Sequence, residues 1–488
     1  MTTIHSIPQD VLCMIFLLLP RIDYLNVKTI CSHWYNIWMN PIQRKHSAKR
    51  YHEGLDPRVS KLLQRRKHIL FLGPGGTGKT YNLQSVADWC IINAIPFGLT
   101  CMTGVAAANL SENGLYRAST LHSFGGIPPK DISPEELFRV IRSKKHCRTT
   151  WINLKVLIID EISMMGSTLF DTLSGALCML RENNNPFGGI SLVVSGDFLQ
   201  LPPVKQGWIW KSNVWKSMVS NLYTFSFLRP MRYPDTDYFN LLLRCRNGTV
   251  TNEDDRLLQH RYKVFHNTIW EGGQILPTIL LSRRIEVDEY NEEELSKLQG
   301  TPMTFVAEDT THFRQNMIVV NSEIVKTFDS QIPPVIKLNV GAQVMLKINI
   351  DPSDGLYNGA RGVVESLRDD GVHVKFMNDQ VRFIERHTWI YETDTYIQTR
   401  TQVPLILAYA LTIHKIQGCS LDYAVCDIGS SIFEAGQAYV ALSRVRTLNG
   451  LFLTEYQRRS IRPSGEALLQ TDNLMKDAME YGIPDRRV

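Results

Sequence analysis

The stretch that most constrains the fold of this chain is HILFLGPGGTGKT, residues 68–80. An apolar run leads into Gly73-x-x-x-x-Gly78-Lys79-Thr80, which is the spacing of a phosphate-binding loop between a strand and a helix. Glycines let consecutive backbone N–H groups turn toward phosphates, and the following helix directs its positive N-terminal end at them. The sequence therefore predicts an ATP site formed by Gly73, Pro74, Gly75, Gly76, Thr77, Gly78, Lys79 and Thr80.

Within this site, Lys79 is expected to reach the β- and γ-phosphates, and Thr80 to hold Mg²⁺. The acidic half of the site is predicted in KVLIIDEISMMG, where the apolar run 156–159 is typical of a strand covered on both faces. Asp160 follows as a Mg²⁺ ligand, and Glu161 as the base that orients the attacking water.

A third apolar strand, in SLVVSGDFLQLPPV, ends at Asp197 and Gln200. We expect Gln200 to hydrogen-bond the γ-phosphate and to report its loss. The alternative interpretation is a polar loop closed by Pro202 and Pro203.

Strand and helix patterns divide the chain into several parts. Apolar strands alternating with amphipathic helices over 66–225 predict an α/β doubly wound parallel sheet, and a second is expected from 226–330 with 396–460. Between them, 331–395 has short β-rich runs separated by turn pairs such as Asn358-Gly359, which predicts a small β-barrel. Residues 461–488 are interpreted as a C-terminal tail. Asn113-Gly114 predicts a hairpin near 109–119.

Composition limits the class of protein. The 488 residues carry a net charge of +5 and should form roughly three domains. Nine cysteines without a C-x-x-C pair indicate thiols of a reducing, intracellular compartment, nuclear or cytoplasmic. The apolar run 11–19 is too short for a membrane span, and its flanks differ from those of a secretion signal.

Two basic segments leave alternatives open. Residues 44–67 contain nine Lys or Arg against Glu53 and Asp56. They are interpreted as a DNA-backbone patch, a nuclear address or, for 46–65, a solvated linker. The same alternatives apply to RSKKHCR at 142–148.

Eight ordered blocks resemble the Pif1/RecD-like helicases of superfamily 1B. They are GPGGTGKT, TGVAAANL with TLHSFGGI, LIIDEISMM, GDFLQLPPV, LRPMRYPDTDYFNLLLRCRNG, LNVGAQVMLKINIDPSDGLYNGARGVV, VPLILAYALTIHKIQGCSLDYAV and GQAYVALSRVRTLNGLFL. The resemblance implies two RecA-like motor domains, an SH3-like insertion at 331–395, and an ATP-dependent 5′–3′ DNA helicase. It implies action on single strands and duplex junctions, in replication, repair, recombination or telomere maintenance.

The resemblance also implies roles for single residues. Arg232 and Arg444 match arginines that reach the γ-phosphate from the second motor domain, with Arg229 as the alternative to Arg232. Five residues match blocks that touch the DNA strand or couple it to ATP: Thr103, His122, Thr412, His414 and Lys415. The family's adenine-binding Gln has no clear counterpart upstream of the P-loop, and Ile416 stands where many relatives have Ser.

The N-terminal segment 1–45 is a further module. Leu12, Ile15, Phe16 and Leu19 line one helical face, and Val11, Met14 and Leu18 line a second apolar face. With Ile7-Pro8 ahead of it, the segment resembles an F-box, which implies a Skp1-like partner that binds Ile7, Pro8, Val11, Met14 and Leu18. The alternative is that the segment packs on its own motor.

Two other functions remain open at this point. One is a ubiquitin-ligase adaptor that uses the motor as a DNA-recognition arm, and the other is an ATP-binding protein without unwinding activity.

Overall fold

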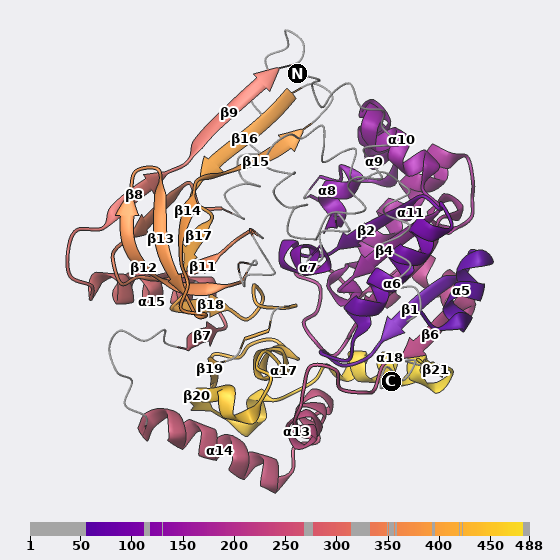
Figure 1. The fold of residues 1–488 in the computed structure, drawn as a ribbon. Coiled ribbons are helices and arrows are strands. Elements are labelled where there is room, and N and C mark those ends of the chain that lie inside the picture. The colour runs from indigo at the N-terminus through magenta and orange to yellow at the C-terminus, as the bar shows by residue number, and fades with distance from the viewer. Residues whose placement is uncertain are drawn as a thin grey trace, which may run out of the picture.

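A computed structural model describes residues 55–111, 118–128, 130–267, 277–313, 332–348, 350, 356, 359–392, 396–418, 420–421 and 423–481. Two parallel sheets and an antiparallel β-rich part surround the centre of the molecule (Figure 1). The F-box-like segment, with Ile7, Pro8, Val11, Met14 and Leu18, and the Asn113-Gly114 turn lie outside the described residues. Among the described helices, none combines the length and apolar character that crossing a bilayer requires.

The first domain is built on a seven-stranded parallel sheet of order β21-β6-β1-β5-β4-β2-β3, which confirms the predicted doubly wound sheet. Its strands are β1 (His68–Leu72), β2 (Phe97–Cys101), β3 (Ser119–Thr120), β4 (Val156–Asp160), β5 (Ser191–Gly196), β6 (Leu222–Ser226) and β21 (Met479–Glu480). Parallel pairing of β1 with β5 and of β5 with β4 brings the carboxyl ends of the three predicted site strands together at one edge.

Helices cover both faces of this sheet because its central strands are apolar on both sides. Leu70 and Leu72 belong to one buried cluster, and Ile69 and Phe71 belong to the cluster on the opposite face. The helices are α5 (Pro57–Gln64), α6 (Lys79–Ile92), α7 (Gly104–Leu110), α8 (Leu121–Gly125), α9 (Pro134–Ser143), α10 (Lys145–Asn153), α11 (Ser167–Arg181), α12 (Asn213–Met218) and α18 (Gly465–Lys476), with 3₁₀ turns at η2 (Ile162–Met164), η3 (Pro186–Gly189), η4 (Ile209–Lys211) and η5 (Val219–Asn221).

The segment predicted as the linker 46–65 differs from that prediction in its described part. Asp56 caps helix α5 by accepting a hydrogen bond from the backbone N–H of Arg58. Val59 and Leu63, one turn apart on α5, are both buried in the core of the first domain. The basic residues of α5 therefore occupy the solvent face of a packed helix rather than a free linker.

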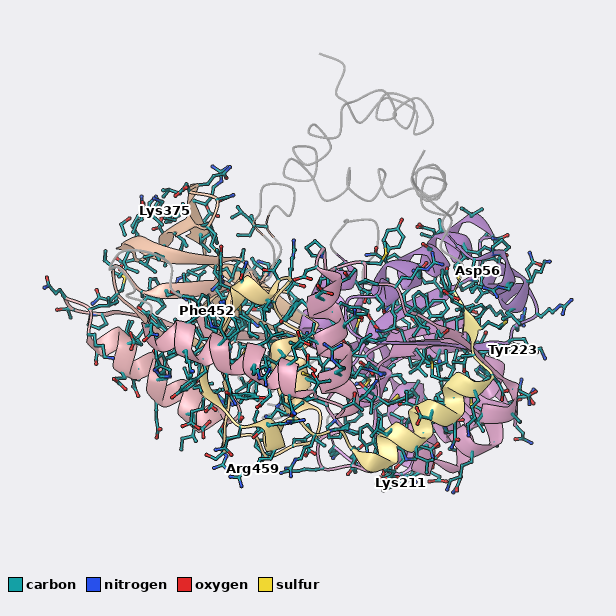
Figure 2. The ribbon with its side chains drawn as sticks, turned by 90° about the horizontal axis from the view of Figure 1, so that it is seen from below. Asp56, Lys211, Tyr223, Lys375, Phe452 and Arg459 are labelled. Atoms are coloured by element: carbon teal, nitrogen blue, oxygen red, sulfur yellow. The ribbon has the colours of Figure 1, made fainter. Side chains whose placement is uncertain are left out.

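The C-terminal segment also belongs to this domain. Strand β21 adds to the sheet beside β6, and the Tyr481 ring stacks on Phe227 with centroids 4.5 Å apart. The Tyr481 hydroxyl accepts a hydrogen bond from the Asp56 backbone N–H at 3.0 Å. Seen from below, α18 runs along the outer face of the domain near Lys211, which pairs with Glu466 (Figure 2).

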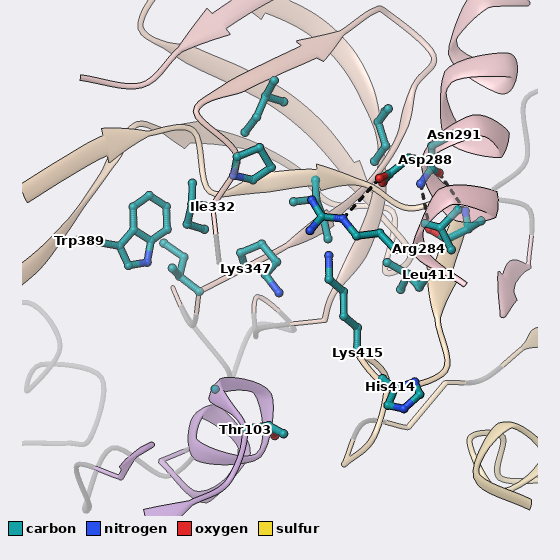
Figure 3. Close-up of a pocket in the computed structure, with 18 of the residues that line it drawn as sticks. Thr103, Arg284, Asp288, Asn291, Ile332, Lys347, Trp389, Leu411, His414 and Lys415 are labelled. Atoms are coloured by element: carbon teal, nitrogen blue, oxygen red, sulfur yellow. Dashed lines mark hydrogen bonds and ion pairs between the residues drawn. The ribbon is translucent and has the colours of Figure 1, made fainter. Parts of the chain in front are cut away.

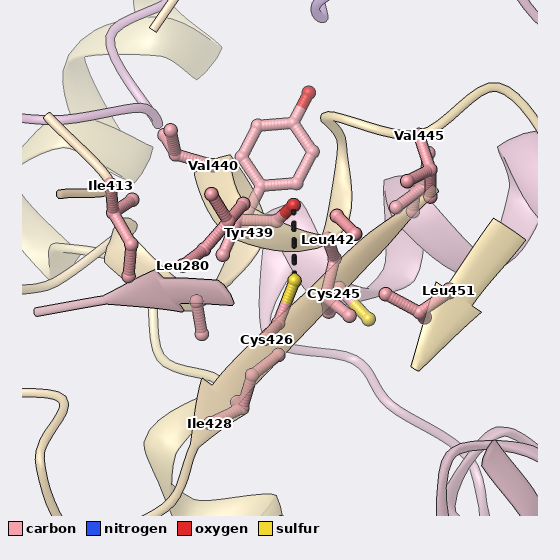
Figure 4. Packing of buried hydrophobic residues seen from close by; sticks show 14 of the residues in the cluster. Cys245, Leu280, Ile413, Cys426, Ile428, Tyr439, Val440, Leu442, Val445 and Leu451 are labelled. Atoms are coloured by element: carbon pink, nitrogen blue, oxygen red, sulfur yellow. Dashed lines mark hydrogen bonds between the residues drawn. The ribbon is translucent and has the colours of Figure 1, made fainter. Parts of the chain in front are cut away.

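The second domain contains a four-stranded parallel sheet of order β18-β7-β19-β20. Its elements are β7 (Thr278–Leu281), β18 (Ala410–Thr412), β19 (Ala424–Ile428), β20 (Leu451–Tyr456), α13 (Thr236–Asn247), α14 (Asn252–Asn267), α15 (Arg284–Ser296), α17 (Gln437–Leu442), η7 (Leu448–Gly450) and η8 (Arg458–Ser460). Its buried cluster packs Leu280, Cys426 and Leu451 of the sheet against Tyr439 and Leu442 of α17 (Figure 4).

The β-rich part begins earlier and ends later than the predicted 331–395. Its elements are β8 (Met303–Val306), β9 (Glu308–Phe313), β10 (Val335–Leu338), β11 (Gln343–Leu346), β12 (Arg361–Arg368), β13 (Gly371–Phe376), β14 (Val381–Glu385), β15 (His387–Glu392), β16 (Tyr396–Gln402) and β17 (Leu405–Leu407). Strands β8 and β9 pair with β10 and β16, so they belong here rather than to the second parallel sheet. The five-stranded sheet β14-β13-β12-β11-β17 is antiparallel, and its closure into an SH3-like barrel stays a prediction.

Candidate functional site: a P-loop at the interface of two domains

The P-loop connects β1 to α6 as predicted from its spacing. Gly76 and Gly78 have φ of +78° and +88°, which other residues rarely adopt. A Cβ on Gly73 would lie 2.2 Å from the Phe227 carbonyl oxygen, so this position also requires glycine. Lys79 Nζ donates to the Gly73 and Pro74 carbonyls at 2.7 Å each. The lysine charge is thus held at the mouth of the loop.

Thr80 and Asp160 lie together although they are 80 positions apart in sequence. Thr80 Oγ1 donates to Asp160 Oδ2 at 2.9 Å, and Asp160 Oδ1 accepts the backbone N–H of Glu161 at 2.9 Å. This follows from the parallel sheet, because β1 and β4 flank β5 and end at the same edge. A hydroxyl and a carboxylate oxygen in this arrangement are hard ligands of the kind that Mg²⁺ prefers.

Glu161 is half-buried beside Asp160 and has a left-handed backbone with φ of 56°. Burial and the neighbouring Asp160 raise the pKa of Glu161 to about 6, although Lys79 and Arg444 oppose the rise. Its Oε2 accepts a hydrogen bond from Gln417 Nε2 of the second domain at 3.1 Å. A carboxyl with a raised pKa, held in a cleft by a specific partner, is typical of a general base.

The second domain covers the P-loop with Tyr439 and Arg444. The Tyr439 hydroxyl accepts a hydrogen bond from the Gly75 N–H at 3.1 Å. A Cβ on Gly75 would lie 3.8 Å from Arg444 Nη2 and 3.5 Å from Gln200 Nε2, so these two predicted residues converge on one point of the loop. Burial and the nearby Arg232 lower the pKa of Arg444.

Arg232 and Arg229 have different surroundings, which distinguishes between the two candidate arginines. The Arg232 backbone N–H donates to the Gly76 carbonyl at 3.0 Å, and its buried Nη1 has no hydrogen-bond partner among the described residues. Arg229 is exposed and pairs with Glu480 at 3.6 Å. The side chain that lies beside the P-loop is therefore Arg232.

Asp197 lies at the end of β5 and forms a buried ion pair across the domain interface. Its carboxylate accepts from Nε and Nη2 of Arg246, on α13, at 2.7–3.0 Å. Asp197 is fully buried and Arg246 is 8% exposed. Since Gln200 N–H donates to the Asp197 carbonyl at 3.1 Å, the pair also fixes the turn that carries Gln200.

A cavity of about 1000 Å³ opens between the two domains and the β-rich part (Figure 3). Three of the five residues expected to touch DNA line it: Thr103 from the first domain, and His414 and Lys415 from the second. Burial and the nearby Arg284 lower the pKa of Lys415, and burial lowers that of His414.

The other two residues lie elsewhere. Thr412 lines a smaller cavity of about 630 Å³, which shares His414 and Arg284 with the large one. His122 lines neither of these two cavities, and burial lowers its pKa. Its neighbours Thr120 and Ser123 line the large cavity instead.

Sequence reasoning missed several lining residues. Trp389, Lys347 and Arg284 contribute an aromatic ring and two cations to the large cavity. Trp389 comes from β15 and is half-buried, with its ring 4.7 Å from that of His387. A single Trp in a short strand gives no sequence pattern that predicts a binding role. Gln417, which hydrogen-bonds Glu161, lies within the block HKIQG and could have been predicted from it.

Taken together, a P-loop, an acidic strand end and residues supplied across an interface define a two-domain P-loop nucleotide-binding protein. Its large cavity is lined by apolar side chains, several cations, the carboxylates of Asp288 and Glu292, and Trp389. The model described as PIF1-like helicase matches residues 57–256, and that of the DNA helicase Pif1 2B domain matches 328–367. An F-box domain model matches residues 4–46, as predicted for the N-terminal module.

Relatives of known name agree with these models. The human ATP-dependent DNA helicase PIF1 is 35% identical over 417 residues, which cover 83% of this chain and 61% of the human protein. Its counterpart from Danio rerio is 34% identical and covers 85% of this chain and 62% of the relative. The chain thus spans about three fifths of the length of these relatives.

Solved structures cover the fold more completely. The Pif1 helicase of Candida albicans matches with a TM-score of 0.72 and 31% identity, over 87% of this chain and 98% of that one. Bacteroides Pif1 bound to single-stranded DNA matches with a TM-score of 0.62 and 27% identity, over 86% and 96%. The chain belongs to the Pif1-like helicase family.

Proposed function

We propose that the protein is an ATP-dependent DNA helicase that moves 5′ to 3′ along a single strand. The observation that carries this proposal is the convergence of Gln200, Arg232 and Arg444 on a P-loop at a domain interface, beside a cavity lined by both domains. The curated relatives are named ATP-dependent DNA helicases, and the family resemblance implies the polarity.

In this proposal the P-loop residues Gly73 to Thr80 bind the phosphates of ATP, and Lys79 neutralises them. Thr80 and Asp160 would hold Mg²⁺, which when bound neutralises charge on the transferred phosphoryl group. The fit is supported by the pairing of their oxygens at 2.9 Å. The structure of Bacteroides Pif1 in complex with ADP-AlF4 matches this chain with a TM-score of 0.67.

Hydrolysis then depends on groups from both domains. Glu161 accepts a proton from the attacking water, and Gln417 orients the Glu161 carboxylate. Arg444 and Arg232 stabilise charge that develops on the γ-phosphate, and Gln200 contacts the same group. Because Arg232, Gln417 and Arg444 belong to the second domain, nucleotide turnover is coupled to the relative position of the domains.

The single strand is proposed to occupy the large cavity. Thr103, His414 and Lys415 contact it as the family blocks imply, and Lys347 and Arg284 add positive charge for its phosphates. Trp389 supplies a face for base stacking, which elsewhere contributes about 1–3 kcal/mol per base. Thr412 acts next to the strand from the smaller cavity, and His122 acts next to it from helix α8.

The test is unwinding of duplexes that carry either a 5′ or a 3′ single-stranded tail. ATP-dependent strand separation is expected with the 5′ tail, and binding should weaken steeply with salt. Preferential unwinding from 3′ tails would refute the polarity, and ATP hydrolysis without any unwinding would favour a DNA-gripping adaptor instead. The same family context suggests work in DNA replication, repair, recombination or telomere maintenance, at a nuclear or cytoplasmic site.

A second function is favoured by the F-box match at residues 4–46. We propose that residues 1–45 bind a Skp1-like protein through Ile7, Pro8, Val11, Met14 and Leu18. All the ATP-site and cavity residues follow residue 66, so deletion of 1–45 should preserve unwinding. Pull-down with intact protein and with Pro8→Ala/Met14→Glu tests the partner, and loss of unwinding on deletion without any Skp1-type partner would refute the module.

A further inference from the structure

A strongly basic surface lies at the turn between α9 and α10, away from the residues assigned above. We call Arg139, Arg142, Lys144, Lys145 and Arg148 the basic turn. Four of these side chains are exposed, and Lys144 is half-buried. Glu135 lies one helical turn before Arg139 and offsets part of its charge, whereas no Asp or Glu occurs between residues 137 and 159.

The stability of helices α9 and α10 explains the position of only some of these cations. Arg142 lies in the last turn of α9, where a cation favours the helix dipole. Lys145 and Arg148 lie in the first turn of α10, where a cation opposes the dipole. That turn has no acidic residue and no side-chain cap. The helix dipole of α10 therefore does not account for the position of these cations.

The basic turn lies directly behind the helix that forms one wall of the large cavity. Thr120 and Ser123, at the start of α8, line that cavity. On the other side of α8, Lys144 Nζ donates to the Gly126 carbonyl at 3.3 Å and Trp151 Nε1 donates to Gly125 at 3.2 Å. Figure 1 shows α8, α9 and α10 grouped at one end of the first domain. A single helix, about 10 Å wide, separates the cavity from the basic turn.

We propose that the basic turn binds the phosphate backbone of the duplex from which the single strand is drawn. This rests on the proposed helicase function. Duplex DNA carries one charge per about 1.7 Å of its axis, twice the density of one strand, so it suits an exposed cluster of cations. Arginine is well suited here because its planar guanidinium binds two phosphate oxygens at once.

The experiment compares binding to a 5′-tailed duplex with binding to the tail alone, over a salt series. The variant is Arg139→Ala/Arg142→Ala/Arg148→Ala, which keeps helix-forming residues on exposed positions. On the tailed duplex, the slope of log K against log salt should fall by about 0.9 for each phosphate that the variant no longer neutralises. Binding to the tail alone, and ATP hydrolysis stimulated by it, should be unchanged.

The matched control removes three exposed cations of the second domain, Arg256, Lys263 and Arg459. Helix α14, which carries the first two, lies at the opposite end of the molecule (Figure 1). The control should keep the wild-type salt slope on both ligands. An unchanged slope for the basic-turn variant, or an equal decrease on tail and tailed duplex, would overturn the duplex assignment. Failure of the wild type to bind the tail or hydrolyse ATP would instead refute the proposed function.

Discussion

At the scale of single residues, Glu161 has the most informative environment. Desolvation and the neighbouring Asp160 raise the pKa of this half-buried carboxyl to about 6, and Gln417 of the other domain hydrogen-bonds it. A carboxyl with this pKa is ionised at neutral pH. Its pKa is also close enough to neutral pH for efficient proton transfer.

We therefore predict that kcat/KM for ATP rises with pH through about 6 and then levels off, since the base must be ionised to accept a proton. Glu161→Gln should abolish this limb and lower kcat by about 10²–10⁴-fold, while ATP still binds. Steady-state ATP hydrolysis on either side of that pH measures both effects. A glutamine variant with wild-type turnover would show that Glu161 only supports the fold.

The arginines make a second prediction. Arg444→Ala should lower kcat by about 10³-fold or more with a smaller effect on nucleotide binding, because its charge acts on the transition state. Arg232→Ala should behave similarly, whereas Arg229→Ala should leave hydrolysis near the wild-type rate, since Arg229 pairs with Glu480 at the surface. Single-turnover hydrolysis compares the three variants. If Arg229→Ala proved the inactive one, the assignment of this block would be wrong.

Lys79→Ala should abolish DNA-stimulated hydrolysis without unfolding the protein. The ammonium group hydrogen-bonds the Gly73 and Pro74 carbonyls of the P-loop itself, so the substitution removes phosphate-binding charge rather than core packing. Hydrolysis assays should be paired with thermal melting, and turnover in a folded variant would contradict the P-loop assignment.

At the scale of elements, the helices and strands that could be predicted are those encoded by one contiguous stretch of residues. The strand–loop–helix of the P-loop and the strands before Asp160 and Asp197 could be predicted from apolar runs and glycine spacing. The two-residue strand β21 could not, because its place beside β6 depends on residues hundreds of positions away. The same holds for β8 and β9, which pair only with strands that come later in the chain.

Tyr481 tests the importance of β21. Tyr481→Phe removes the acceptor of the buried Asp56 N–H and should lower the free energy of unfolding by about 1–3 kcal/mol. Tyr481→Ala also removes the ring that stacks on Phe227 and should cost about 3–5 kcal/mol. Tyr223→Phe, on the exposed side of β6, is the control. Chemical denaturation measures all three, and equal stability of the Tyr481 and Tyr223 variants would refute a structural role for the tail.

At the scale of the whole molecule, the Asp197–Arg246 pair joins the two domains. Removing one partner of a buried pair leaves an uncompensated charge, which typically costs about 3–5 kcal/mol. We predict that Arg246→Ala destabilises the interface and splits thermal unfolding into two calorimetric transitions. Arg244→Ala breaks the partly exposed pair with Asp254 within the second domain and serves as the control. A single, unshifted transition for Arg246→Ala would show that the domains are joined by other contacts.

The position of β21 also has a consequence for protein synthesis. The first domain needs a strand that leaves the ribosome only after the entire second domain and β-rich part have been made. At about 5–20 residues per second, the interval between Ser226 and Met479 lasts roughly 10–50 s. During that time the β6 edge and Phe227 are without their final cover, so a nascent chain would expose an open sheet edge to chaperones. A chain that stopped before Met479 would carry every ATP-site residue but an unfinished first domain.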